Sequence, residues 1–136
     1  MITPRFSVNR NDIGAVVEAF YARVRQDEEL GPVFAAHVHD WPAHEEKITR
    51  FWANAILFER AYYGNPMQVH MKAGNVHAAH FPKWLALFAS TLHDHLPPEP
   101  AAGWSQLAHR IGRGLSMGVE EYHRPPDAVP DLTSRF

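Results

Sequence analysis

The sequence contains no cysteine among its 136 residues. That absence excludes disulfide bonds, thiolate metal sites, iron–sulfur clusters and cysteine nucleophiles together. No apolar run approaches the roughly 20 residues that a membrane-spanning helix requires. The first residues also lack the charged-then-apolar plan of a secretion signal. We therefore expect a cytoplasmic protein that has no membrane partner.

Neither sign of charge dominates, because 13 Lys and Arg face 15 Asp and Glu for a formal net charge of −2. Without a basic stripe the chain offers no footprint for a phosphate backbone, so nucleic acid is not expected as a partner. The glycines of residues 112–118 (GRGLSMG) lie inside a helical pattern and do not form a phosphate loop. Serines in a nucleophile-elbow pattern are also missing. Catalysis by a side-chain nucleophile has little support.

Aromatic residues and histidine are abundant instead. The chain has 8 Phe, 4 Tyr, 4 Trp and 10 His. A domain of this size needs fewer rings to close its own core, so the packing of a flat, apolar molecule is one explanation for the surplus.

Apolar residues recur at three- and four-residue spacing nearly throughout, and no strand alternation occurs, which predicts an all-α chain. Residues 1–124 are expected to form one domain, followed by a loosely attached, Pro-rich tail at 125–136. The predicted helices are a first one ending near Gly31-Pro32, one capped by Asp40 and ending at Gly64, a short one carrying His70, one beginning at Pro82 and ending at residues 96–100, and a last one running from Trp104 to Tyr122.

Metal-binding patterns are incomplete. His44 begins HEEKI, whose second histidine position is occupied by Ile48, so the zincin spacing fails. Glu120 and His123 form one Glu-x-x-His pair, whereas a di-iron bundle needs two pairs and two further glutamates. A non-haem, His-rich metal-binding helical protein and a haem-free interaction module nevertheless stay open as alternatives.

Polar side-chain tips occur on the apolar faces of several predicted helices. Tyr21, His44 and Trp84 are each explained singly as core residues with an ordinary hydrogen bond. Taken together with His70, on its short isolated helix, they predict a pocket with donors on one side and a basic nitrogen on the other.

Four segments in this order, EAFYARVRQDEELGPVF, HEEKITRFWANAILF, YGNPMQVHMK and HFPKWLALF, resemble the third group (P-type) of truncated hemoglobins over roughly residues 10–123. The resemblance implies a two-over-two α-helical globin sandwich around haem b. It makes His70 the proximal iron ligand, with the opposite coordination site left open. It also assigns Tyr21, His44 and Trp84 to the distal side, where the diatomic ligand binds.

The resemblance further implies a set of haem contacts and a class of function. Lys47 is expected to pair with a haem propionate. The ligand is expected to be dioxygen, nitric oxide or carbon monoxide. The expected role is redox or gas detoxification chemistry, with electrons from an unidentified electron donor, rather than bulk oxygen transport. The remaining haem-contact candidates are Phe34, Ile48, Phe51, Trp52, Phe81, Phe88, Leu115 and Met117.

Overall fold

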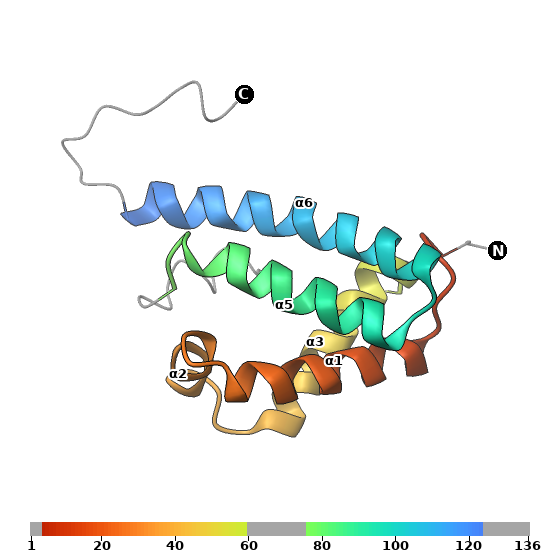
Figure 1. Ribbon diagram of the computed structural model, residues 1–136, viewed down its shortest axis with the longest axis horizontal. Helices are drawn as coiled ribbons and strands as arrows, with labels where there is room; N and C mark the ends of the chain where they lie inside the picture. Colours follow the sequence, from red (N-terminus) through yellow and green to blue (C-terminus); the bar gives the residue numbers. More distant parts are fainter. Residues whose placement is uncertain (1–3, 60–75, 124–136) are drawn as a thin grey trace.

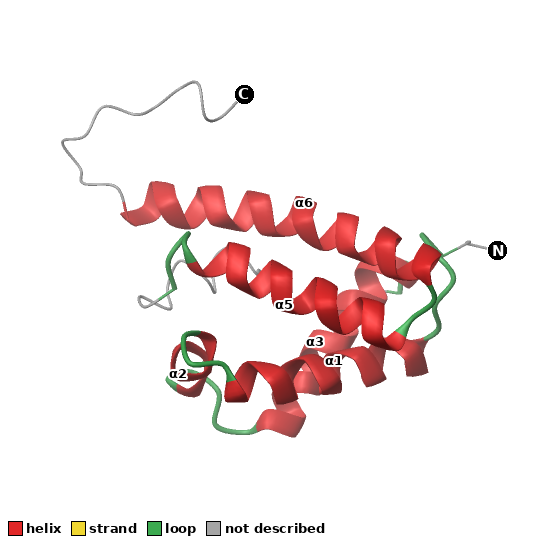
Figure 2. Cartoon of the chain, in the orientation of Figure 1, coloured by secondary structure: helices red, strands yellow, loops and turns green. Residues whose placement is uncertain are grey.

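The computed structural model describes residues 4–59 and 76–123, and within these ranges the regular secondary structure is entirely helical (Figures 1 and 2). The prediction of an all-α chain is confirmed for this part. None of the described helices is long and apolar enough to cross a membrane. The helices are α1 (Arg10–Gln26), α2 (Leu30–Ala35), α3 (Trp41–Leu57), α5 (His80–His95) and α6 (Pro98–His123).

Two packed helix pairs form the frame of the domain. Helix α1 packs on α3, α5 packs on α6, and α1 also contacts α5, which joins the pairs. Figure 1 shows α5 running beside α6, with α1 on the other side of α5 and α3 behind it. The short α2 packs against α1 at one end of the frame.

Helix α1 begins with a capping box in which Asn9 accepts from the Asp12 N–H and Asp12 accepts from the Asn9 N–H, both at 2.9 Å. It ends at Gln26, earlier than the predicted stop at Gly31-Pro32. The reason is Asp27, whose Oδ1 accepts the N–H groups of Glu29 and Leu30 at 2.9 Å and turns the chain into α2. Pro32 falls in the first turn of α2, where its missing N–H costs nothing.

Helix α3 is capped by Asp40, which accepts from the Ala43 N–H at 3.1 Å as predicted. It ends at Leu57, before the predicted stop at Gly64, which lies outside the described residues. Phe58 ends the helix because it adopts a left-handed conformation with φ 61°. Arg5 stabilises this end, since its backbone N–H and its Nε donate to carbonyls of the last turn at 3.0 and 2.8 Å.

Helices α5 and α6 are joined by a tight connection. Helix α6 begins at Pro98, six residues before the predicted Trp104, because proline is favourable at the first helical position. Farther along, Gly112 lets the two helices approach closely. A Cβ at this position would lie 3.2 Å from a methyl group of Leu85.

The core between the helix pairs is a continuous stack of rings centred on Phe88, which is 1% exposed. Its ring stacks on Trp52 with centroids 5.5 Å apart and on Trp84 at 5.3 Å. Phe20 and Trp104 meet the same ring edge-on at 4.9 and 5.6 Å. Many of the aromatic residues therefore form the core itself. Trp52 and Trp84 belong to this stack and also line a cavity.

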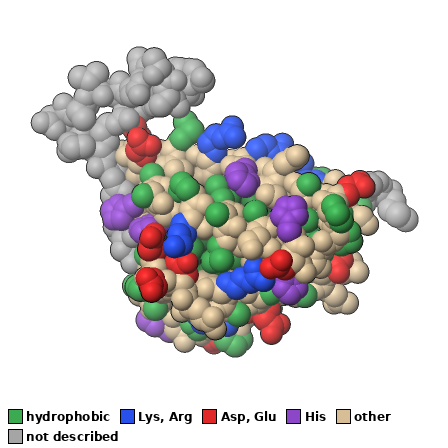
Figure 3. Space-filling view, viewed as in Figure 1, with side chains coloured by type: hydrophobic (Ala, Val, Ile, Leu, Met, Phe, Trp, Pro, Cys, Tyr) green, Lys and Arg blue, Asp and Glu red, His purple; other side chains and the backbone are tan. Residues whose placement is uncertain are grey.

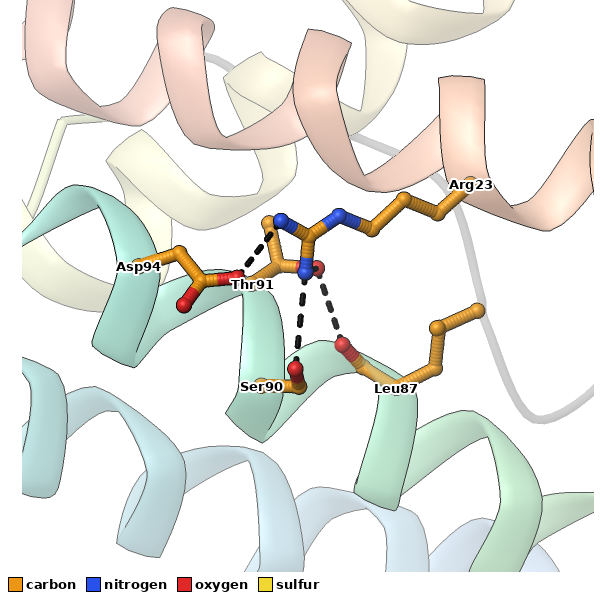
Figure 4. Close-up of polar contacts among 5 residues, drawn as sticks. All are labelled: Arg23, Leu87, Ser90, Thr91 and Asp94. Atoms are coloured by element: carbon orange, nitrogen blue, oxygen red, sulfur yellow. Dashed lines mark hydrogen bonds and ion pairs between the residues drawn. The ribbon is translucent and has the colours of Figure 1, made fainter.

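A polar cluster also joins α1 to α5 (Figure 4). Arg23 donates to Asp94 Oδ2 at 2.7 Å, to Thr91 Oγ1 at 3.3 Å and to Ser90 Oγ at 3.5 Å. The hydroxyl of Thr91, which is fully buried, donates to the Leu87 carbonyl at 2.8 Å. Elsewhere on the face shown in Figure 3, acidic, basic and histidine side chains are intermingled, and no stripe of one sign is visible.

Candidate ligand-binding cavity

A cavity of about 330 Å³ lies among the described helices, and every one of them contributes to its wall. Its lining is largely aliphatic and aromatic, with few polar groups, which is typical of a site for an apolar small molecule. The lining residues are Tyr21, Leu30, Val33, Phe34, His37, Val38, His44, Lys47, Ile48, Phe51, Trp52, Val76, His80, Phe81, Trp84, Ile111, Gly112 and Leu115.

The structure brings together the three polar tips that the sequence singled out, Tyr21 from α1, His44 from α3 and Trp84 from α5. The rings of Tyr21 and His44 are 4.9 Å apart and nearly perpendicular, at 79°. Tyr21 is 3% exposed, so its hydroxyl acts in a site shielded from water. The Nε2 atom of His44 is buried and has no hydrogen-bond partner within the described part of the chain. A buried nitrogen without such a partner at a cavity wall is available to a ligand in the cavity.

Burial sets the protonation of both groups. Desolvation raises the pKa of the Tyr21 phenol, and the nearby Glu45 carboxylate raises it further, so Tyr21 remains a neutral O–H donor. Desolvation also lowers the pKa of His44, with a smaller contribution from the Lys47 ammonium. His44 is therefore a neutral imidazole at neutral pH and carries a single N–H.

Most of the predicted wall residues also lie at the cavity. The structure places Phe34 from α2, Lys47, Ile48, Phe51 and Trp52 from α3, Phe81 from α5 and Leu115 from α6 in its lining.

Two predicted contacts lie elsewhere. The structure buries Phe88 in the core, where it stacks behind Trp52 and Trp84 and does not reach the lining. Met117 is 39% exposed and is also absent from the lining. Leu115, two residues earlier, does line the cavity, and two residues turn a helix by about 200°, so Met117 faces away.

Several lining residues were not predicted. Leu30 and Val33 belong to α2, and His37 and Val38 follow it. The sequence predicted no separate helix here, only the end of the first helix near Gly31-Pro32. Ile111 and Gly112 lie one turn before Leu115 on α6, a spacing that could have identified them.

His80 also lines the cavity, as the first residue of α5, two residues before the predicted helix start at Pro82. Its Nδ1 accepts a hydrogen bond from the His77 N–H at 2.9 Å. A ring whose Nδ1 accepts a hydrogen bond carries its proton on Nε2, where that proton occupies the lone pair that a metal would need. His70 lies outside the described residues, as do the domain boundary at 124 and the tail.

Comparison with known proteins identifies the class. A model of the bacterial-like globin family matches residues 9–107. A group 3 truncated hemoglobin of Campylobacter jejuni is 34% identical over 91 residues, which cover 64% of this chain and 72% of that protein. The crystal structure of a group III truncated hemoglobin from Campylobacter jejuni matches with a TM-score of 0.82 and 29% identity, covering 88% of this chain and 97% of that one.

The fold and the family match together define a globin, the class of helical proteins that bind haem. The packing of α1 on α3 and of α5 on α6 is the two-over-two arrangement of the truncated members of this class. Within it, the chain belongs to the group III truncated hemoglobins.

The described residues fit a haem. A haem is a flat apolar disc with two carboxylates on one edge, and the cavity offers apolar walls from all its helices with the Lys47 ammonium among them. His44 Nε2 supplies a buried nitrogen that has no hydrogen-bond partner among residues 4–59 and 76–123. Metal sites of another kind find no support in this part of the chain, where no group of three or more His, Asp or Glu side chains is arranged to hold an ion.

Proposed function

We propose that the cavity holds haem b and binds dioxygen, or another diatomic ligand such as nitric oxide or carbon monoxide, on the side formed by Tyr21, His44 and Trp84. The observation that carries this proposal is the convergence of these three polar side chains on one apolar cavity, where a buried nitrogen of His44 has no partner among the described residues. A haem iron held by one histidine supplies an open coordination position for such a gas.

His70 is the proposed iron ligand. The family resemblance implies the proximal side for it, and the geometry of two other histidines, His80 and His44, supports the choice. His80 is engaged through Nδ1 by the His77 N–H at 2.9 Å, so it would have to give up that bond before its Nε2 could bind iron. His44 is on the wall that also carries Tyr21, where the ligand is expected.

The chemistry of the distal groups favours a redox or detoxifying role. Tyr21 stays protonated because burial raises its pKa, and its O–H donates to a ligand that gains negative charge. Trp84 offers an indole N–H and neutral His44 one imidazole N–H, so the same ligand can be held by several donors. A ligand held by several donors leaves slowly, which suits oxidation or reduction by an electron donor better than oxygen delivery.

The test is gas binding by the reduced, haem-loaded protein. We expect its absorption spectrum to shift on addition of carbon monoxide and of dioxygen with one equivalent of each bound. A spectrum that neither gas changes would show that a second side chain occupies the open position, and would contradict the proposal.

A further inference from the structure

The imidazole of His44 lies in a box of aromatic rings. Tyr21, Phe34 and Trp41 surround it with centroid distances of 4.9, 6.3 and 5.9 Å, and each ring is within about 20° of perpendicular to the imidazole. Tyr21 and Phe34 line the cavity, but Trp41 does not. Trp41 therefore contacts His44 without itself lining the cavity.

Trp41 is itself held by a charged side chain from another helix. The guanidinium of Arg25 lies 4.8 Å from the centroid of the Trp41 ring. The same guanidinium forms an ion pair with Glu45 on α3, with Nη1 and Oε2 3.5 Å apart. The Glu45 side chain is only 16% exposed, so this pair is partly shielded from water.

Sequence spacing explains how these groups meet. Arg25 follows Tyr21 by four residues on α1, so both side chains lie on the face that packs on α3. Trp41, His44 and Glu45 occupy the first turns of α3 at three- and four-residue spacing and face α1 in the same way. Each helix therefore carries a cavity residue and, one turn away, a residue outside the cavity lining. These pairs are Tyr21 and Arg25 on α1, and His44 and Trp41 on α3.

We propose that Arg25 and Trp41 form a clamp that holds the His44 imidazole against the cavity, so that they act as positioning residues for the distal donor. The contacts that surround His44 are aromatic, and its Nε2 has no protein partner within the described residues, so ring packing sets its orientation. Losing the clamp releases His44 into positions where it no longer faces the ligand. This role rests on the proposed function, because it matters only if a ligand binds beside His44.

The expected effect is modest and measurable. A cation–π contact of partly exposed groups biases an equilibrium by about two- to fivefold. We therefore expect Arg25→Met, which keeps an unbranched apolar stem but removes the charge, to raise the association rate of carbon monoxide by about two- to fivefold. Trp41→Leu should have at least this effect, whereas Trp41→Phe, which keeps an aromatic face for Arg25, should restore most of the wild-type behaviour.

Arg23→Met is the matched control. Arg23 is also on α1, two residues from Arg25, but it pairs with Asp94 of α5 and not with α3. Its loss should lower the unfolding midpoint without changing the carbon monoxide rate.

The experiment combines kinetics with two spectroscopic readouts. In the carbon monoxide complex of the wild type we expect one infrared carbon monoxide band, with nuclear Overhauser contacts between the Trp41 and His44 rings. Arg25→Met should add a second band at higher frequency and weaken those ring contacts. In a His44→Leu background, Arg25→Met should change neither the rate nor the band.

Three outcomes would overturn the clamp. These are unchanged bands and rates in both Arg25→Met and Trp41→Leu, an equal effect of Arg23→Met, or an effect of Arg25→Met that persists without His44. The ring contacts between Trp41 and His44 are measurable on the protein as purified, whether or not it binds a gas. If the protein binds no gas but shows these ring contacts, the proposed function is contradicted and the packing of Trp41 on His44 is not.

Discussion

Replacing Tyr21 by Phe removes one hydroxyl and little else. The Tyr21 ring is 3% exposed and packs against Phe20, Phe34 and His44 with centroids 5.0, 5.6 and 4.9 Å away. A phenylalanine ring fits the same contacts, so the cavity keeps its shape. The change therefore isolates the hydrogen bond that the hydroxyl donates to a ligand in the cavity.

The magnitude follows from the charge on the ligand. Dioxygen bound to a ferrous haem iron would carry partial negative charge, whereas bound carbon monoxide would stay nearly neutral. A hydrogen bond to a charged acceptor is worth about 1.5–3 kcal/mol when it is shielded from water, which corresponds to about ten- to hundredfold in affinity. We expect Tyr21→Phe to speed dioxygen dissociation by at least about tenfold and to change carbon monoxide dissociation much less.

The assay is stopped-flow displacement of each gas from the wild type and from Tyr21→Phe, with carbon monoxide as the internal control for cavity shape. Because burial raises the pKa of Tyr21, the difference should persist at mildly alkaline pH, where an ordinary tyrosine begins to lose its proton. Equal and small effects on both gases would show that Tyr21 is a core residue only, and that Trp84 or His44 supplies the donor.

Three further predictions concern other parts of the chain. His70→Gly should weaken haem binding and lower the unfolding midpoint, since haem stabilises the folded state that binds it; an unchanged histidine–iron stretch in the Raman spectrum of the ferrous variant would mean that another histidine is the ligand. Burial lowers the pKa of His44 below its ordinary 6.5, so the unfolded chain binds this proton more readily and stability falls as the pH drops below that value. Urea unfolding across this pH range should therefore show a weaker pH dependence in His44→Leu than in the wild type, and an identical dependence would refute the assignment. Deleting residues 125–136 should leave the spectrum and the unfolding midpoint nearly unchanged, and a loss of several degrees would place the domain boundary beyond residue 124.

Helical periodicity was enough to identify three polar residues that line the cavity. Tyr21, His44 and Trp84 each belong to a regular apolar stripe on a long helix, so the faces that carry them could be read from spacing alone. Which helices face one another depends on tertiary packing, and the family resemblance supplied that part of the prediction.

The misses have local causes. Periodicity cannot separate a six-residue helix from the end of its neighbour, and α2 was missed because the side chain of Asp27 makes the turn that starts it. Phe88 follows Trp84 by one turn on the same stripe, but one end of that stripe faces the cavity and the other faces the core. Spacing shows that both residues are buried and does not show against what.

We propose that this cavity binds one haem, and a hemin titration measures that binding. Hemin is added to the haem-free protein while the Soret absorbance is recorded for the wild type and for His70→Gly. We expect an intense Soret band that saturates at one equivalent in the wild type, and weaker binding in the variant. A protein that shows no saturable Soret band with added hemin would contradict the proposal.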